Sequence, residues 1–396
     1  MNCWHILTSK YPPAAGGIGH HSAHLAYGLR KRNFEVHVWT TVLGKEEPLN
    51  KNSYNNDGLK TTYVDEDGVT VHRLVTSWNT ENFDHLAELI SEKGGTLLIQ
   101  YKPTIFGGYW NSALDGFVGK LKSSGRLQAI NLIIHEPFAI PQASILRPRT
   151  WLAPAYQYVL LRNLLKNSDN TYVTTNNWKR FLKPFKLREN LVTLPVPSNI
   201  RNVAERQFSL NLRKAFASDA KMIIGTYSSF KEYEMLEILD AVISKTLTAN
   251  PDWVWLLLGR QADKYCERLV QKYPAIADQI QTAGELDQNA LSAHLQVADM
   301  MVQPYFQGVN TRRTSTMAAL FHAMPVITST GQKTESIWWE TRCVRLVDWK
   351  EPSQYLEAIR TLSANENQRL QLSHAARLTY ESCFSLEQNL RLLTSV

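Results

Sequence analysis

The chain alternates short runs of almost entirely apolar residues with longer segments in which apolar residues recur every three to four positions. In the first half, the apolar runs lie at 4–9, 35–41, 69–74, 96–101, 131–136, 171–175 and 192–197. Short apolar runs are typical of strands buried on both faces of a parallel sheet, and the longer segments between them predict helices. The helices are expected near 20–32, 81–93 and 111–123. Strands that alternate with helices in this way predict βαβ units.

The same alternation starts again after 198–207, a polar stretch that suits a linker. In the second half, strands are predicted at 221–227, 253–260, 279–284, 298–305 and 325–330. Helices are predicted near 232–248, 262–271, 288–297, 314–323, 352–363 and 366–378. We therefore predict an α/β fold of two Rossmann-like, doubly wound domains, 1–200 and 208–378, that face each other across a cleft. Ligands of such sheets bind beyond the carboxyl ends of the strands, so residues directly after strands are candidates for chemistry.

Composition agrees with two globular domains. The chain has 396 residues, of which 44% are hydrophobic, 20% charged and 10% aromatic, which excludes a largely disordered chain. No apolar stretch approaches the ~18–20 residues of a transmembrane helix, and the N-terminus lacks the pattern of a signal peptide. The four cysteines lie far apart without a C-x-x-C pair. A reducing, cytoplasmic setting is therefore expected rather than a disulfide framework.

The formal net charge of +7 is mild. Lys and Arg do not cluster with aromatic residues on one element, so we predict no nucleic-acid binding. A phosphorylated small molecule or an anionic membrane surface would each suit the charge, and solubility alone explains it as well.

Glycines and histidines lie between the first predicted strand and the first helix. In Gly16-Gly17-Ile18-Gly19, glycines would let backbone N–H groups approach an anion, although, taken alone, they indicate a tight strand-to-helix turn. His20 and His24 could share a helix face and hold zinc. Because no H-E-x-x-H and no obvious third ligand accompanies them, we predict no metal site.

Two further segments directly follow strands. His135 and Glu136 end the strand at 131–136, either at a substrate or as a pair that caps the strand. Ser229 and Lys231 follow the strand at 221–227, where hydroxyls and a lysine suit an oxyanion and an ordinary exposed lysine is the alternative.

The most informative segment is 308–319, in which two arginines directly precede a helix. Arg312, Arg313, Thr314 and Ser315 bring guanidinium groups, hydroxyls and free N–H groups of a helix N-terminus together. That combination predicts a site for a diphosphate.

Taken in order, these segments resemble glycosyltransferases of the GT-B fold, in the large retaining family four (the glycosyltransferase group 1). The resemblance runs nearly end to end through ILTSKYPPAAGGIGHHSAHLAYGLRKRNFEVHVWT, IIHEPF, IIGTYSSFK, WVWLLLGR and ADMMVQPYFQGVNTRRTSTMAALFHAMPVITSTG. FSLEQNL near the C-terminus resembles the final helix of the family, which implies that 379–396 crosses back to the first domain.

The resemblance implies a metal-independent, hexosyltransferase-type enzyme that needs no cofactor. It would move a sugar from a nucleotide-diphosphate donor, held mainly by the second domain, to an acceptor on the first, with retention of configuration. Lys231 and backbone amides near Thr314 would hold the diphosphate, and His135 would contact the transferred sugar. The loop Gly17-Ile18-Gly19 would close over the diphosphate and the reacting centre.

The sequence departs from the family at three positions. Thr226 stands where an arginine usually accompanies the lysine, and the Glu-x7-Glu signature falls on Asn310 and Ala318. We expect Arg312 or Arg313 to supply the missing cation. A branch of the family reads much like GVNTRRTSTMAAL, which implies a variant active site rather than an inactive one.

Departure of a nucleoside diphosphate places negative charge on the leaving oxygen, which fixed cations stabilise. The hypothesis is that Lys231 and one of the two arginines clamp the diphosphate while His135 and Glu136 orient the donor sugar. The leaving phosphate then takes the acceptor's proton. The alternatives are a weakly active or inactive nucleotide-sugar-binding partner of another transferase, and an epimerase of nucleotide sugars. A nicotinamide-dependent dehydrogenase is disfavoured by the glycine pattern.

The acceptor is expected to be a glycan or a lipid-linked molecule. Residues 142–166 mix Arg and Lys with Trp, Tyr and Leu. They suit either peripheral contact with the inner membrane or a first-domain helix with an apolar core face.

Overall fold

The computed structural model describes residues 3–14, 16–43, 62–108, 110–138, 149–185, 191–201, 206–217, 220–231 and 233–395. The chain forms two compact units, Met1–Pro195 with Asn389–Val396, and Val196–Gln388. None of the helices in the described part is both long and apolar enough to cross a lipid bilayer.

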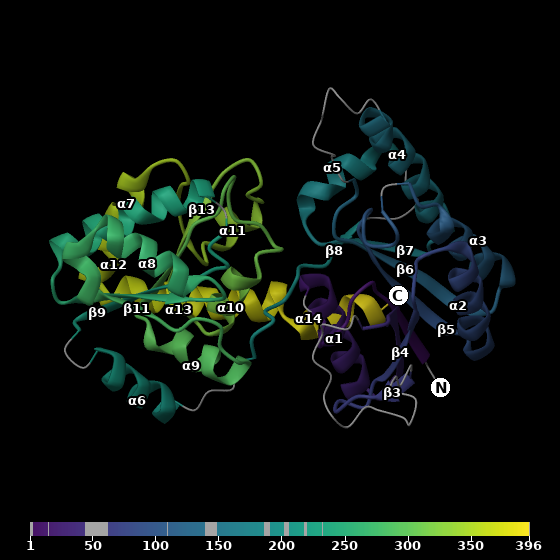
Figure 1. Ribbon diagram of the computed structural model, residues 1–396, viewed down its shortest axis with the longest axis horizontal. Coiled ribbons are helices and arrows are strands. Elements are labelled where there is room, and N and C mark those ends of the chain that lie inside the picture. The colour runs from purple at the N-terminus through teal and green to yellow at the C-terminus, as the bar shows by residue number, and fades with distance from the viewer. Residues whose placement is uncertain are drawn as a thin grey trace. The chain divides into compact units, whose positions relative to one another are not determined.

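The first unit is built on an eight-stranded sheet in the order β3-β4-β2-β1-β5-β6-β7-β8 (Figure 1). Its strands are β1 (Cys3–Leu7), β2 (Glu35–Thr41), β3 (Thr62–Val64), β4 (Thr70–Val75), β5 (Gly95–Tyr101), β6 (Leu127–Ile134), β7 (Asn170–Val173) and β8 (Val192–Thr193). All neighbours are parallel except β3, which pairs with β4 in the antiparallel direction. Its helices are α1 (Gly17–Lys31), α2 (Thr80–Lys93), α3 (Ala113–Ser124), α4 (Arg149–Asn167) and α5 (Lys179–Leu182).

Helices cover this sheet because its central strands are apolar on both faces. On one face, Leu7, Leu97 and Ile99 pack in a single core with Phe83 of α2 and Phe117 of α3. The C-terminal helix α14 (Leu386–Thr394) lies beside α1, where the Arg32 guanidinium donates a hydrogen bond to Thr394 at 3.0 Å (Figure 1).

The second unit holds a six-stranded, all-parallel sheet in the order β11-β10-β9-β12-β13-β14. Its strands are β9 (Met222–Tyr227), β10 (Trp253–Leu258), β11 (Ile280–Thr282), β12 (Met300–Gln303), β13 (Val326–Thr330) and β14 (Arg345–Asp348). Its helices are α6 (Arg206–Ala217), α7 (Tyr233–Ala249), α8 (Ala262–Lys272), α9 (Gln288–Val297), α10 (Thr314–Phe321), α11 (Ile337–Thr341), α12 (Pro352–Ala364) and α13 (Glu366–Thr379). Separate cores fill the two faces, one around Met301 and Met317 and the other around Ile224 and Leu257.

These units confirm the predicted fold class of two Rossmann-like α/β domains. Three details differ. α1 begins at Gly17, so Gly17 and Gly19 lie in its first turn and not in a preceding loop. Helix α6 begins inside the stretch 198–207 that was predicted as a linker. The short edge strands β3 and β14 were not predicted, because neither carries a long apolar run. How the two units face each other stays a prediction.

Candidate functional site

The order of the second sheet identifies the strand ends at which a ligand is expected. β9 has β10 on one side and β12 on the other, so the chain reverses direction across the sheet between β9 and β12. Ligands of doubly wound sheets bind at such a switch point, beyond the carboxyl ends. Lys231 follows β9, and the segment 308–315 follows β12. The topology therefore brings the two predicted phosphate-binding segments to neighbouring strand ends.

The loop after β9 is held firmly around its exposed residues. The Ser228 amide donates to the Leu258 carbonyl at 3.0 Å, and the Ser228 hydroxyl accepts from the Phe230 amide at 3.2 Å. Phe230 is buried and stacks on Tyr265, with the ring centroids 4.9 Å apart. Ser229 and Lys231, on either side of this anchor, are exposed. The lysine is thus available to a ligand in solution.

Helix α10 begins beside a cation that rests on an aromatic ring. The Arg313 guanidinium lies 4.5 Å from the centroid of the Tyr305 ring. The Tyr305 hydroxyl is 2.7 Å from the Ser315 hydroxyl and 2.8 Å from that of Thr316, and burial raises its pKa. Thr314 and Ser315 are half-buried in the first turn. A positive side chain and the positive end of a helix dipole therefore lie together.

A buried carboxylate shapes the loop that carries the two arginines. Glu335, 3% exposed, accepts hydrogen bonds from the Thr311 amide at 2.6 Å and the Thr311 hydroxyl at 3.1 Å. The Asn310 side-chain oxygen accepts from the Arg312 amide at 3.1 Å, and the Asn310 carbonyl accepts from the Arg313 amide at 3.1 Å. Sequence reasoning missed Glu335, because no spacing rule links it to a residue 24 positions earlier.

Two positions at which the sequence departs from the family lie in the core. Thr226 is fully buried, donates to the Val302 carbonyl at 3.0 Å and accepts from the Trp255 indole at 3.1 Å. Ala318 is also fully buried, within an apolar cluster. These side chains stabilise the second unit.

In the first unit, His135 lies just beyond the carboxyl end of β6. Its ring is buried, and Nε2 donates to Gln100 Oε1 on the neighbouring β5 at 2.6 Å. Its backbone is held on both sides, since its amide donates to the Tyr101 carbonyl and its carbonyl accepts from the Trp178 indole. His135 is therefore rigidly placed at the edge where a ligand of this sheet is expected.

His21 of α1 lies next to this histidine. The two ring centroids are 5.4 Å apart in an edge-on arrangement, and burial lowers the pKa of His21 to about 4, which keeps it neutral. Neither ring nitrogen of His21 makes a hydrogen bond of normal geometry within the described residues, although the Gln100 side chain lies close enough to raise the pKa of His21 in part. His21 was not predicted as a site residue, since only His20 and His24 of this run were considered as ligands.

The other residues of the first unit that were predicted to bind substrate are Glu136, Gly17, Ile18 and Gly19, and their environments differ. Glu136 forms an ion pair with Lys102 at 3.0 Å, so its charge is already neutralised. Gly17 is exposed, Ile18 is half-buried and Gly19 is buried. A Cβ at Gly19 would lie 2.9 Å from the Lys10 carbonyl oxygen. Glycine, which has no Cβ, therefore lets the first turn of α1 pack closely against the backbone of Lys10.

Arg73 was not predicted from the sequence. It is 4% exposed, and its Nη2 donates to the carbonyl oxygens of Tyr11 and Pro12. The buried guanidinium therefore holds the backbone that precedes the glycines.

Part of the predicted membrane-facing stretch, 142–148, lies outside the described residues.

Part of the second unit is similar to a known protein family. Residues 221–365 match the family model described as "Glycosyl transferases group 1". This match lies entirely within the second unit. The matched range includes Lys231 and both arginines that precede α10.

Solved structures match the chain over its whole length. A sucrose-phosphate synthase from Thermosynechococcus elongatus has a TM-score of 0.70 at 16% identity, and the match covers 100% of this chain and 98% of that one. The Anabaena protein Alr3699/HepE in complex with UDP has a TM-score of 0.69 at 11% identity, with 100% and 99% covered. WaaG, a glycosyltransferase involved in lipopolysaccharide biosynthesis, has a TM-score of 0.60 at 13% identity, with 99% and 100% covered. These similarities show the GT-B fold. No curated protein sequence matches the chain at a significant level.

Proposed function

We propose that the protein is a glycosyltransferase that moves a sugar from a nucleoside-diphosphate donor to a glycan or lipid-linked acceptor, with retention of configuration. The observation that carries the proposal is the pair of cationic segments, Lys231 after β9 and Arg312-Arg313 before α10, at neighbouring strand ends of a group 1 domain. UDP complexes among proteins of the same fold agree with a nucleotide donor.

In this proposal, the second unit stabilises the leaving group. Lys231 and Arg313 neutralise the charge that grows on the diphosphate, while N–H groups in the first turn of α10 donate to its oxygens. Tyr305 limits the motion of the Arg313 guanidinium. No metal ion and no cofactor takes part, and the cation missing at Thr226 is supplied by Arg312 or Arg313.

The first unit orients the sugar. His135 is held by Gln100, and together with the neutral His21 it presents hydrogen-bonding groups of the kind that recognise sugar hydroxyls. The leaving phosphate then accepts the proton of the acceptor hydroxyl as the new glycosidic bond forms on the same face. This scheme needs no protein nucleophile.

The test begins with a thermal-shift screen against UDP-, GDP-, ADP- and dTDP-sugars, because a ligand that binds the folded state raises the melting temperature. With the donor found, Lys231→Ala is expected to lower transfer by about 100-fold or more, equivalent to ~3 kcal/mol of transition-state stabilisation. Lys245→Ala, an exposed lysine on α7, is the matched control and is expected to retain full activity. Full activity of Lys231→Ala would refute the assignment.

Donor hydrolysis without acceptor separates the proposal from its main alternative. A transferase hydrolyses its donor slowly, whereas an inactive nucleotide-sugar-binding partner shifts the melting temperature without consuming the donor. Interconversion of the donor sugar without transfer would identify an epimerase.

The acceptor side is proposed to rest on an anionic membrane surface. Along α4, Leu152 and Val159 are 63% and 53% exposed, and Arg162 and Lys166 continue the same exposed stripe. Apolar side chains with adjacent cations suit the headgroup region of a bilayer. Flotation with vesicles that contain anionic lipid is expected to recover the wild type and to lose the Leu152→Glu/Val159→Glu variant. Equal recovery of both would contradict the proposal.

A further inference from the structure

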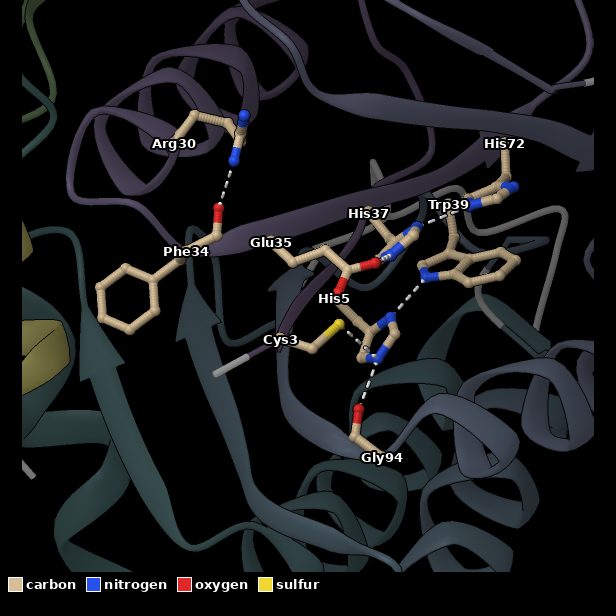
Figure 2. Close-up of polar contacts among 9 residues, drawn as sticks. All are labelled: Cys3, His5, Arg30, Phe34, Glu35, His37, Trp39, His72 and Gly94. Atoms are coloured by element: carbon tan, nitrogen blue, oxygen red, sulfur yellow. Dashed lines mark hydrogen bonds and ion pairs between the residues drawn. The ribbon is translucent and has the colours of Figure 1, made fainter. Parts of the chain in front are cut away.

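Two ligand-type pairs lie side by side at the amino end of the first sheet. Cys3-x-His5 is on β1 and Glu35-x-His37 is on β2, and the parallel register aligns Cys3 with Glu35 and His5 with His37 (Figure 2). Side chains two positions apart on a strand share a face, so all four project from the same side of the sheet. This is the end opposite the strand termini that carry His135.

Three of these side chains present donor atoms within reach of one ion. The Cys3 sulfur, a Glu35 carboxylate oxygen and a His37 ring nitrogen lie within 4.8 Å of one another. His37 Nε2 is 2.8 Å from Glu35 Oε1. A thiol, an imidazole and a carboxylate form a donor set that zinc and similar divalent ions prefer.

His5 is excluded as a ligand by its own hydrogen bonds. The Trp39 indole can only donate, and it donates to His5 Nδ1 at 3.1 Å (Figure 2). The single ring proton therefore sits on Nε2, which donates to the Gly94 carbonyl at 2.7 Å. Binding a metal through Nε2 would require the ring to lose its last proton. His5 instead forms one wall of the site, with Nε2 at 3.5 Å from the Cys3 sulfur.

His37, in contrast, has an outer partner that suits a metal ligand. Its Nδ1 is 2.9 Å from His72 Nε2, and His72 Nδ1 is 3.1 Å from the Thr62 hydroxyl. When a cation replaces the proton on His37 Nε2, that ring carries its proton on Nδ1 and donates it to His72 Nε2. His72 then carries its own proton on Nδ1 and donates to Thr62. Such outer hydrogen bonds fix the orientation of metal-binding histidines.

We propose that Cys3, Glu35 and His37 bind a divalent cation of the zinc type, with solvent in the fourth position. The Cys3 thiol loses its proton to solvent on binding, the Glu35 carboxylate is already ionised, and each histidine keeps one proton. The Glu35 side chain is 46% exposed, which gives the ion a path from solvent. The ion joins β1 to β2 far from the proposed transfer site, so its role is to stabilise the first unit.

The test uses Co²⁺, whose spectrum reports its ligands. The full-length protein, reduced and freed of metal by a chelator, is titrated with Co²⁺. The expected result is one bound ion per chain, with a sulfur-to-cobalt charge-transfer band in the near ultraviolet and the intense visible bands of a tetrahedral site. Zn²⁺ is expected to displace the cobalt and to raise the melting temperature. The absence of a charge-transfer band in the wild type would overturn the proposal.

Variants assign the ligands. Cys3→Ser is expected to abolish the charge-transfer band, and His37→Gln to weaken Co²⁺ binding by more than about tenfold, the least that loss of an outer partner costs. Cys266→Ser changes a half-buried cysteine of the second unit, away from the site, and is expected to leave the spectrum intact. Loss of the band in Cys266→Ser, or its persistence in Cys3→Ser, would contradict the assignment.

A measurement on the wild type keeps the proposal testable if a variant does not fold. The alkylation rate of each cysteine is measured by peptide mapping. Saturating Zn²⁺ is expected to slow alkylation of Cys3 and to leave alkylation of Cys266 and Cys383 unchanged. Equal rates at Cys3 with and without Zn²⁺ would refute the site.

Discussion

Lys231 owes its exposed position to tightly packed neighbours. Phe230 adopts a positive φ of 52° and is buried against Tyr265, so the side chain that follows it faces solvent. Gly259, at the end of β10, lets the Ser228 backbone approach, because a Cβ there would lie 2.1 Å from the Ser228 carbonyl oxygen. The position of Lys231, the proposed phosphate-binding residue, therefore depends on Gly259, which is not itself proposed to bind the phosphate.

Gly259→Ala tests this dependence. Its φ of 121° is one that L side chains rarely adopt, and the added methyl would displace the Ser228 carbonyl. We expect the variant to be destabilised by about 1–3 kcal/mol in urea unfolding and to bind the donor more weakly. Gly116→Ala, at an exposed position inside α3 with open space around it, is the matched control and is expected to stabilise by about 0.5–1 kcal/mol. Unchanged stability and donor binding in Gly259→Ala would show that the contact does not hold the loop.

At the scale of helices and strands, the hydrophobic pattern predicts most of the fold. The central strands, such as β5 and β10, are apolar runs buried on both faces, and the amphipathic period locates α2 and α8 to within a few residues. β3 was not predicted because it is a three-residue strand at the edge of the sheet and none of its residues is buried. α6 was not predicted because its polar side chains bond to residues far along the chain; the Arg213 guanidinium donates to the Val297 carbonyl and pairs with Asp299.

The candidate site could be predicted only in part. Arg312, Arg313 and Lys231 stand out in the sequence because cations, hydroxyls and glycines gather beside strand ends. Arg73 and Glu335 do not, since each supports a loop that is distant in sequence through hydrogen bonds to its backbone. Such support depends on where the chain folds back, which local composition does not encode.

Helix α10 provides a pH-dependent contribution to stability. His322, at its C-terminal end, has Nδ1 2.7 Å from the Ala318 carbonyl and Nε2 2.8 Å from the Ser292 hydroxyl of α9. Burial, with a smaller effect from Arg377, lowers the pKa of His322. The folded protein therefore holds this ring neutral, whereas the unfolded chain takes up a proton below pH ~6.5. Stability is fully present above that pH and is lost as the pH falls through it, by at most about 1.4 kcal/mol per pH unit for one proton.

His322→Gln tests the sign of this effect. Glutamine keeps a donor and an acceptor but does not titrate. Urea unfolding at several pH values between 7.5 and 5 is expected to give a smaller loss of stability in the variant than in the wild type. A variant with the same pH dependence as the wild type would show that His322 is protonated equally in both states.

At the scale of the whole molecule, the chain crosses from the second unit back to the first within α14. The Asn389 side chain donates to the Pro195 carbonyl at 2.7 Å, and Tyr172 donates to the Leu392 carbonyl at 3.4 Å. Leu390 and Leu393 are almost fully buried in the same segment. The last residues of the chain therefore contribute to the core of the first domain.

Leu393→Ala is expected to destabilise the first unit without affecting the second. Leu393 is 1% exposed, and removing a buried leucine side chain typically costs about 2–5 kcal/mol. Leu370→Ala, on α13 and 59% exposed, is the matched control and is expected to change stability by less than about 0.5 kcal/mol. Thermal unfolding measures the loss, and calorimetry is expected to show unchanged nucleotide binding in the folded variant. A wild-type melting temperature for Leu393→Ala would contradict this role.

The proposed function requires that cations of the second unit hold a nucleoside diphosphate. The most direct test is calorimetric titration of the preferred nucleoside diphosphate, and of the same nucleoside without phosphates, into the wild type, Lys231→Ala and Arg313→Ala. Lys221→Ala serves as the control, because Lys221 precedes the amino end of β9 and pairs with Asp252. We predict that only the diphosphate binds strongly to the wild type and the control, and that each site variant binds it about 10–100-fold more weakly, since a charge-assisted hydrogen bond contributes ~1.5–3 kcal/mol. Equal affinity of the wild type and both site variants for the diphosphate would contradict the account.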